Sequence, residues 1–249
     1  MTGIGWLVRI AVFLLLALFL LTPESFAPLL RPLARYGAPA VYNQGSLLGI
    51  TLSHLGITLL ATLAATAIAV GLAILVTRPS GAEFLPLSRS IANVGQTFPP
   101  VAVLALVVPV LGFGTAPTLV ALFLYALLPI FENALAGLSN IPRDVREAAE
   151  GMGMTGWQRL TRVELPLAFP VMLTGIRIAA VISLSTATIG STIAARTLGE
   201  VIIAGLTTAN TAFVLQGGLV VGVCAVLIND SLGALEGWLR RRTGRADGR

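Results

Sequence analysis

Residues 139–166 read SNIPRDVREAAEGMGMTGWQRLTRVELP and hold a dense run of arginine, aspartate and glutamate. The chain as a whole is very different, because only 11% of its 249 residues are charged and 56% are hydrophobic. Soluble domains are about one-quarter charged, so a chain with this composition and a mean hydropathy of +0.91 has too little polar surface to face water on all sides. The sequence therefore predicts a membrane protein that keeps one structured, charged segment outside the lipid.

Six apolar runs are long enough, at about 20 residues each, to cross a bilayer as helices. They are residues 6–22, 54–76, 93–114, 117–138, 168–190 and 212–234. The first run could instead be a cleaved signal peptide, but it lacks a clear small-x-small cleavage site, so we expect a retained helix. The predicted fold is thus an all-α membrane protein with about six transmembrane helices, and the charged segment joins the fourth helix to the fifth.

Arginines gather after the second, fourth and sixth runs, which indicates that these ends face the cytoplasm. They are Arg78 and Arg89, then Arg143, Arg146, Arg159 and Arg162, then Arg240, Arg241, Arg242, Arg245 and Arg249. Residues 139–166 are therefore expected in the cytoplasm, and residues 23–53 and 191–211 on the outer side. The exceptions to this pattern are Arg31, Arg35 and Arg196.

The cytoplasmic segment is predicted to form two short helices rather than a plain solvated connector. Ser139 or Asn140 is suited to cap the first helix, with Pro142 in its first turn. The expected ion pairs along this helix, four residues apart, are Arg143 with Glu147 and Arg146 with Glu150.

A second set of signals ends the first helix and begins the next. Gly151 and Gly153 are expected to stop the first helix, and Thr155 with Gln158 forms the pattern of a capping box. Pro166 is expected to end or kink the second helix where the chain re-enters the membrane. A connector needs neither caps nor a glycine hinge, so this segment is predicted to be a structured docking element.

Several other functions are excluded by the residues. Gly151-Met-Gly153-Met-Thr-Gly156 matches the dinucleotide fingerprint, but that motif requires a preceding strand, and here it would join two helices. The chain contains no lysine and hence no phosphate-binding loop of the Walker type, so it has no ATP site of its own. No cofactor, metal site or enzymatic activity is expected either. Cys224 is the only cysteine, which excludes a disulfide framework, and the arginines lie at the ends of apolar runs as membrane topology requires, not as a nucleic-acid patch.

Small and polar side chains suggest how the membrane helices pack and what passes between them. Two stripes of small residues recur every four residues, namely Ala61, Ala65, Ala69 and Ala73, and Gly218 with Gly222. We expect both stripes to pack within the chain in preference to forming a subunit interface. Charged groups at membrane depth are costly and often functional. The candidate translocation path on the fifth run comprises Arg177, Ser183, Thr186 and Thr188, although hydroxyls also bond back to their own helix. His54, at a membrane boundary, is expected to be structural.

The charged segment resembles the signature loop of the permease subunits of binding-protein-dependent ABC importers. The residues that carry this resemblance are Glu147, Ala148, Ala149, Gly153, Val163, Leu165 and Pro166. The resemblance implies that the loop docks on separate ABC ATPase subunits, which bind the ATP. It also implies a second permease subunit, identical or related, and an extracytoplasmic solute-binding protein, in a bacterial cytoplasmic (inner) membrane. The implied organisation is an N-terminal helix and outer loop (1–53), the permease domain (54–236) and a basic cytoplasmic tail (237–249).

Within this family the chain is similar to the osmoprotectant branch, which imports glycine betaine or choline. The similar segments are 95–100 (GQTFPP), 122–129 (LFLYALLP), 146–155 (REAAEGMGMT) and 175–177 (GIR). One segment departs from the pattern of this branch. Residues 193–199 read Ile-Ala-Ala-Arg-Thr-Leu-Gly, where relatives commonly have Ile-Gly-Ala-Gly-Gly-Leu-Gly. The replaced glycines within Ala194–Thr197 predict a differently shaped outer gate. The alternatives are an amino-acid cargo such as methionine, a secondary transporter, or a membrane scaffold.

Overall fold

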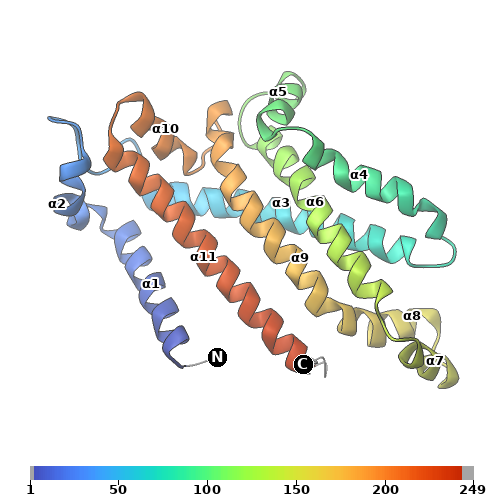
Figure 1. Cartoon of the computed structure of the whole chain (residues 1–249). Coiled ribbons are helices and arrows are strands. Elements are labelled where there is room, and N and C mark those ends of the chain that lie inside the picture. Colours follow the sequence, from blue (N-terminus) through green and yellow to red (C-terminus); the bar gives the residue numbers. More distant parts are fainter. Residues whose placement is uncertain (1–2, 243–249) are drawn as a thin grey trace. The chain divides into compact units, whose positions relative to one another are not determined.

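The structure is a computed structural model that describes residues 3–242, and this part of the chain is helical, without strands (Figure 1). The longer helices are α1 (Gly3–Leu21), α3 (Leu47–Val76), α4 (Leu85–Thr97), α5 (Pro100–Leu111), α6 (Thr115–Ser139), α9 (Leu165–Thr186) and α11 (Thr211–Arg242). The shorter elements are η1 (Pro23–Phe26), α2 (Ala27–Leu30), η2 (Arg31–Leu33), η3 (Ala82–Phe84), α7 (Arg143–Gly151), α8 (Gly156–Arg159), η4 (Leu160–Glu164), η5 (Ala187–Ile193) and α10 (Gly199–Thr207).

Four continuous helical segments are long and apolar enough to cross a membrane, and the number rises to six if each of two bent pairs counts as one span. The continuous segments are α3, α6, the run Gly156–Ile193 that contains α9, and α11. The bent pairs turn by 106° between Gly5–Leu21 and Pro23–Leu33 and by 98° between Ala82–Thr97 and Pro100–Leu111. This confirms the prediction of an all-α membrane protein with about six spans.

The third predicted span, residues 93–114, is interrupted, because the chain breaks between α4 and α5. Phe98 (ψ 140°) and Pro99 (ψ 143°) are extended. Each of them precedes a proline, and the proline ring disfavours the helical conformation of the residue before it. The double proline therefore ends α4 inside an apolar run whose length alone suggested a helix.

The chain divides into two compact units, which are described separately. Unit 1 comprises Met1–Leu60, Pro99–Leu122 and Ser183–Ile228, and unit 2 comprises Ala61–Phe98, Phe123–Ile182 and Asn229–Arg249. In unit 2 the core contains Ala65, Ala69 and Ala73 of α3. These alanines are fully buried, as intrachain packing predicts.

Close contact between α6 and α9 in unit 2 depends on glycine. A Cβ at Gly175 would lie 2.5 Å from the carbonyl oxygen of Pro129, and one at Gly137 would lie 3.0 Å from that of Ala168. Neither helix could approach the other this closely with a larger side chain at Gly175. By contrast, Gly218 and Gly222 of α11 have open space around them, so their predicted packing within the chain is wrong for the described residues.

In unit 1 the core surrounds a buried histidine. His54 Nε2 donates to the carbonyl oxygen of Leu184 (3.0 Å), and Nδ1 accepts from the backbone N–H of Leu198 (3.2 Å). Both ring nitrogens are satisfied by backbone groups and the side chain is fully buried. His54 therefore joins α3 to α9 and to the turn before α10, which agrees with the structural role predicted for it.

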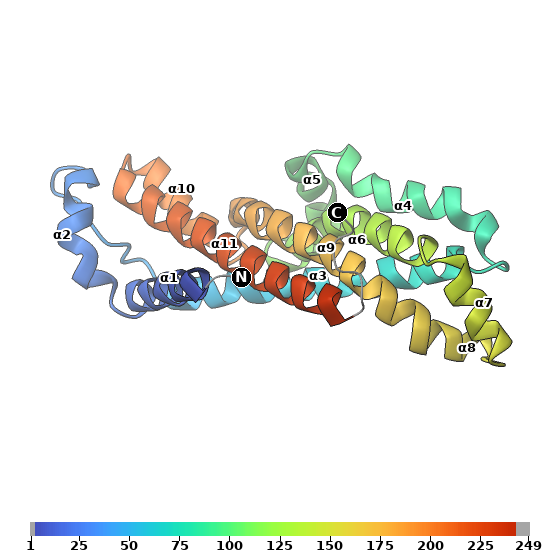
Figure 2. The same ribbon diagram turned by 60° about the horizontal axis from the view of Figure 1, so that its bottom comes forward.

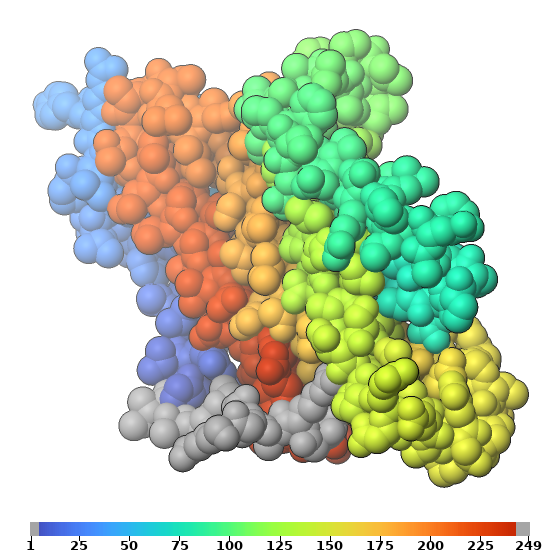
Figure 3. Space-filling model, turned by 45° about the vertical axis from the view of Figure 1, so that its right-hand side comes forward, coloured from blue at the N-terminus to red at the C-terminus, as the bar shows by residue number. Residues whose placement is uncertain are grey.

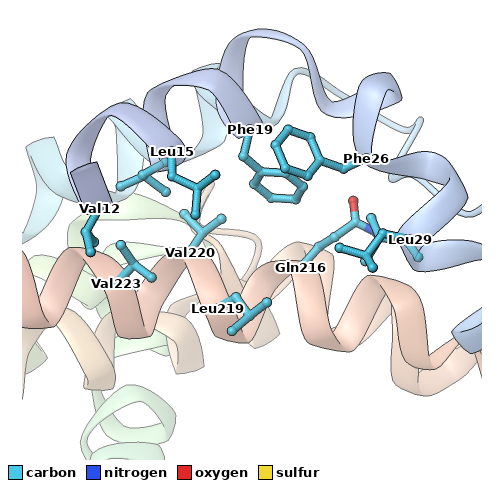
Figure 4. Close-up of a pocket in the computed structure, with 11 residues that line it drawn as sticks. Val12, Leu15, Phe19, Phe26, Leu29, Gln216, Leu219, Val220 and Val223 are labelled. Atoms are coloured by element: carbon cyan, nitrogen blue, oxygen red, sulfur yellow. The ribbon is translucent and has the colours of Figure 1, made fainter. Parts of the chain in front are cut away.

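An apolar pocket of about 260 Å³ lies between α1 and α11 in unit 1. Figure 4 shows Val12 and Leu15 of α1 facing Val223 of α11 across it. Gln216 is the polar side chain at the pocket, but both of its amide hydrogens are used, by the carbonyl oxygens of Ala40 (2.9 Å) and Ala212 (3.0 Å). With no free polar group, this pocket suits hydrocarbon and not a charged ligand.

Candidate coupling segment

The charged segment 139–166 forms a pair of short helices in unit 2, at the end of α6 and the start of α9. Figures 1 and 2 show α7 and α8 lying side by side there. In the space-filling view their yellow surface is open to the outside (Figure 3). We call residues 139–166 the coupling segment.

The first helix of the coupling segment begins later than the sequence suggested. Ser139 is the last residue of α6, and Pro142 takes the cap position of α7 without a side-chain bond, so the predicted Ser139 or Asn140 cap is wrong. The arginine of the next turn performs a related task, because Arg146 Nη2 donates to the carbonyl oxygen of Leu138 at 2.6 Å. A cation at a helix C-terminus satisfies orphan carbonyls and favours the helix dipole, so Arg146 fastens α7 to the end of α6.

The two ion pairs predicted within α7 do not form in the described structure. Arg146 is directed to the carbonyl oxygen of Leu138, and Glu150 pairs instead with Arg159 of α8. The sequence prediction considered only partners on one helix, whereas the turn brings α8 against α7. The observed pair joins the two helices to each other.

A Schellman motif ends α7, and Gly153 provides its left-handed residue. Gly153 has φ +75°, its N–H donates to the carbonyl oxygen of Glu150 (2.9 Å), and the N–H of Met154 donates to that of Ala149 (3.2 Å). A Cβ at Gly153 would meet nothing within 4 Å. The glycine is therefore required by the backbone conformation and not by lack of space.

The second helix begins with the capping box that the sequence predicts. The Gln158 N–H donates to Thr155 Oγ1 (3.3 Å), and the Thr155 N–H donates to Gln158 Oε1 (2.9 Å). Two backbone donors that would otherwise be unsatisfied are paired in this way. Together with the Schellman motif, the box fixes both sides of the turn.

Pro166 does not end the second helix, so the first of the two outcomes predicted for it, an end or a kink, is wrong. The chain runs from α8 through the π-helical turn η4 into α9 as one helical segment, Gly156–Ile193. In an α-helix the proline ring would clash with a carbonyl four residues earlier. A wider turn directly before the proline accommodates this, and π turns occur most often at functional sites.

A buried carboxylate connects the coupling segment to the end of α3, and the sequence analysis missed it. Glu164 is 2% exposed, its Oε2 pairs with Arg78 Nη2, and its Oε1 lies 3.3 Å from Arg159 Nε. Removing water strengthens such pairs and makes either partner costly to lose. The available signal was a carboxylate inside an apolar stretch, between Val163 and Leu165.

The exposed face of the coupling segment combines small, acidic and large apolar groups. Glu147 and Ala148 are exposed, whereas Ala149 is buried against its own unit. Met152 and Trp157 are 69% and 73% exposed. Large exposed apolar side chains beside polar ones are typical of protein interfaces, and these two residues are further candidates for such contacts that sequence reasoning did not single out.

The remaining signature residues lie at the membrane side of the segment. Leu165 packs against the core of unit 2, Val163 is half-buried and Pro166 is exposed. Leu165 thus packs at the start of α9, whereas Pro166 remains on the surface. The signature therefore contains both exposed and packing residues.

The candidate path residues fall in different units. Arg177 belongs to unit 2, where its Nη2 lies 3.3 Å from Glu236 Oε2 of α11. Ser183 is fully buried in unit 1 and its hydroxyl has no hydrogen-bond partner among the described residues. Thr188 donates to the carbonyl oxygen of Ser185 (2.8 Å), the local bond that such hydroxyls commonly make, and Thr186 is half-buried.

The turn at residues 193–199 departs from the glycine-rich pattern, and its left-handed residue is Ala194 (φ 64°). Thr197 is buried, and its hydroxyl lies 2.6 Å from that of Ser191. The close approach is at Gly199, where a Cβ would lie 1.8 Å from the carbonyl oxygen of Thr188. The turn therefore retains its one sterically required glycine.

The described part of the chain thus combines helices of membrane-spanning length with a capped, exposed helix pair. Known sequences identify the class further. The profile described as "Binding-protein-dependent transport system inner membrane component" matches residues 69–245. The chain belongs to this family.

Two relatives show how far the similarity extends. The chain is 40% identical over 200 residues to the osmoprotectant import permease protein OsmY of Salmonella typhimurium, covering 80% of this chain and 83% of that relative. It is 40% identical over 195 residues to the carnitine transport permease protein OpuCB of Listeria monocytogenes, covering 78% and 88%. The similarity therefore extends well beyond the coupling segment.

Solved structures support the fold. An inward-facing form of the MetNI methionine ABC transporter matches with a TM-score of 0.67 and 20% identity, over 76% of this chain and 93% of that chain. An amino acid ABC transporter crystallised with histidines matches with a TM-score of 0.60 and 18% identity, over 78% and 92%. At this identity the likeness concerns the fold alone.

Family membership decides between the alternatives that the sequence left open. The chain is a multi-pass permease component of a bacterial inner-membrane ABC importer, and neither an enzyme, a secondary transporter nor a scaffold. Membership also implies two kinds of partner, an ATPase and a substrate-binding protein.

Proposed function

We propose that this chain is the permease subunit of an importer for a small quaternary-ammonium osmoprotectant such as glycine betaine, choline or carnitine. Relatives at 40% identity are named for osmoprotectant and carnitine import. The methionine transporter, by comparison, shares 20% of its sequence with this chain. The higher identity favours the osmoprotectant cargo over methionine.

The observation that carries the mechanism is the capped helix pair with its exposed apolar face. Energy for uptake comes from ATP bound by the partner ATPase, and the coupling segment receives the movement. Gly153 holds the turn in the conformation that docks, Ala148 allows close approach, and Glu147 makes a polar contact with the ATPase. Ala149, Val163 and Leu165 support the segment from its buried side, and Pro166 follows the π turn at the start of α9. A rigid, doubly capped element transmits a rigid-body movement that a loose loop would absorb.

The membrane part provides the path. Ser183, Thr186 and Thr188 offer hydroxyls to the cargo, and the unpaired hydroxyl of Ser183 supports this role. Arg177 contributes a positive charge that Glu236 holds in place. The path is completed by a second permease subunit, identical or related. In this organisation residues 1–53 form an accessory helix and outer loop, 54–236 the permease domain and 237–249 the basic tail.

Reconstitution tests the proposal. Proteoliposomes containing the permease, its ATPase and its binding protein would be loaded with ATP, and uptake of radiolabelled glycine betaine, choline, carnitine and methionine would be compared. Uptake of at least one quaternary amine that requires ATP is the expected result. Uptake of methionine alone, or uptake of a quaternary amine independent of ATP, would refute the proposal.

A further inference from the structure

A second pocket, of about 460 Å³, opens in unit 1 beside the turn that departs from the glycine-rich pattern. Gln44 and Gly45 from the loop before α3 form one part of its lining, and Ser191, Arg196 and Glu200 form another. Pockets for small molecules measure roughly 300–1,000 Å³ and contain a few well-placed polar groups. This pocket has the size and the mixed lining of such a site, and the sequence predicts residues 23–53 and 191–211, which line it, on the outer side of the membrane.

Arg196 lines the pocket with a guanidinium group that lies near Tyr42 but makes no hydrogen bond or ion pair with the described residues. Its backbone is fixed, because its carbonyl oxygen accepts a hydrogen bond from Ser53 Oγ at 2.8 Å. Its side chain passes close to α3, where Nη2 lies 3.2 Å from the position that a Cβ would occupy at Gly49. No hydrogen bond or ion pair of the described residues uses the five N–H donors, so they are available to a ligand.

Glu200 lines the same pocket with a carboxylate that is only half used. Its Oε1 accepts a hydrogen bond from the Tyr42 hydroxyl at 2.8 Å. Burial, and then the neighbouring Glu200 carboxylate, raise the pKa of Tyr42 to about 12, so the phenol remains a donor at neutral pH. Tyr42 is itself held edge-on by the Phe213 ring at 5.4 Å. The carboxylate is thus oriented from one side, and its second oxygen has no partner among the described residues.

The two opposite charges do not neutralise each other, because no ion pair joins Arg196 to Glu200 in the part of the chain that the structure describes. The backbone between them is constrained by the left-handed Ala194, by the contact of Thr197 with Ser191, and by the tight packing at Gly199. A cation and an anion are therefore held apart on a fixed turn. Such preorganisation lowers the cost of binding a ligand.

We propose that this pocket is an extracytoplasmic binding subsite for a small zwitterion, whose carboxylate pairs with Arg196 and whose cationic head lies against Glu200. An arginine binds a carboxylate through two parallel hydrogen bonds. A quaternary ammonium has no N–H donor, so a carboxylate attracts it through charge alone. A simple anion would leave Glu200 facing a like charge, and a simple cation would leave Arg196 unpaired. The inference rests on the proposed function and specifies which cargo the permease itself recognises.

The test measures binding to the permease without its binding protein. The complex of permease and ATPase would be purified in nanodiscs, and equilibrium dialysis would measure radiolabelled glycine betaine up to millimolar concentration. Two competitors distinguish the contribution of the carboxylate from that of the cationic head. Choline lacks the carboxylate. The second competitor, 3,3-dimethylbutanoate, keeps the shape and carboxylate of the betaine but has an uncharged head. The variants are Arg196→Gln, Arg196→Lys and Glu200→Gln. Arg35→Gln and Glu24→Gln serve as controls because both residues are exposed in the outer segment, outside this pocket.

Loss of one charge-assisted pair predicts about tenfold or greater weakening of betaine binding in Arg196→Gln. The affinity for betaine should fall less in Arg196→Lys than in Arg196→Gln. It should also fall in Glu200→Gln and remain unchanged in the two controls. Neither competitor should displace the betaine as well as unlabelled betaine does. Equal binding by wild type and Arg196→Gln would overturn the subsite, as would the absence of saturable binding by the wild type. A variant that binds betaine normally but loses uptake would also overturn it, since Arg196 would then contact the binding protein. Uptake by wild-type proteoliposomes is measured separately, so failure of the proposed function is distinguished from failure of the subsite.

Discussion

Replacing Gly153 by alanine isolates the turn between α7 and α8. An L-residue with a side chain pays roughly 1–2 kcal/mol in the left-handed region, and Gly153 has φ +75°. A Cβ would meet no atom within 4 Å, so no clash within the chain adds to this cost. A penalty of this size changes an equilibrium by about 5–30-fold. The population of the docking conformation is therefore expected to fall by that factor.

The assay is the number of substrate molecules taken up for each ATP hydrolysed in proteoliposomes. Gly153→Ala should lower this ratio several-fold while the complex still assembles. Gly153→Asn should lie nearer to wild type, since asparagine tolerates the left-handed region. Gly151→Ala is the matched control, because Gly151 lies in α7 at negative φ and its Cβ position is also open. Alanine there should be neutral or stabilise by about 0.5–1 kcal/mol. A wild-type ratio in Gly153→Ala, or an equal loss in Gly151→Ala, would refute the reasoning.

Three further predictions concern ionic, docking and titrating groups. Glu164→Gln leaves two arginines without their buried partner. Because those arginines are partly exposed, the loss of unfolding free energy should lie at the lower end of about 3–5 kcal/mol. The purified permease should therefore unfold at a lower temperature, and an unchanged temperature would contradict the prediction. Trp157→Ala should leave the unfolding temperature unchanged and weaken ATPase binding by about 2 kcal/mol, a typical value for an interface hot spot. The dissociation constant of the permease–ATPase complex measures this effect. Equal constants for wild type and variant would count against the docking face. Because the pKa of Tyr42 is raised from 10.0 to about 12, its stabilising contribution is complete below pH 10 and disappears as the pH rises through 12. Alkaline unfolding should therefore be steeper in wild type than in Tyr42→Phe, and parallel curves would show that the phenol contributes nothing.

The features that the sequence predicted correctly are local ones. The capping box of Thr155 and Gln158 and the left-handed Gly153 depend on residues within one or two turns of each other, so spacing alone identifies them. The alanine stripe of α3 is a periodic pattern, and its burial follows from that period.

The features that the sequence could not predict depend on distant parts of the chain. The pairing of Glu164 with Arg78 joins residues 86 positions apart, and only the packing of the helices brings them together. The partner of Glu150 was assigned to the wrong arginine for the same reason, since a helical pattern describes one helix and not its neighbour. Exposure of Trp157 also depends on the surrounding structure, because the same residue type is usually buried.

The π-helical turn Leu160–Glu164 changes the direction in which the side chains of α8 point around the helix axis. An α-helix advances about 100° per residue, and a π turn contains one extra residue. Side chains of α8 are therefore out of phase with those of α9 by about one residue, or roughly 100°. Deleting one residue from this turn would restore a single helical phase and rotate Trp157 around the axis of α9, without changing any residue of the docking face. The direction in which this permease presents its face to the ATPase is thus set by a single additional residue in the helix behind it.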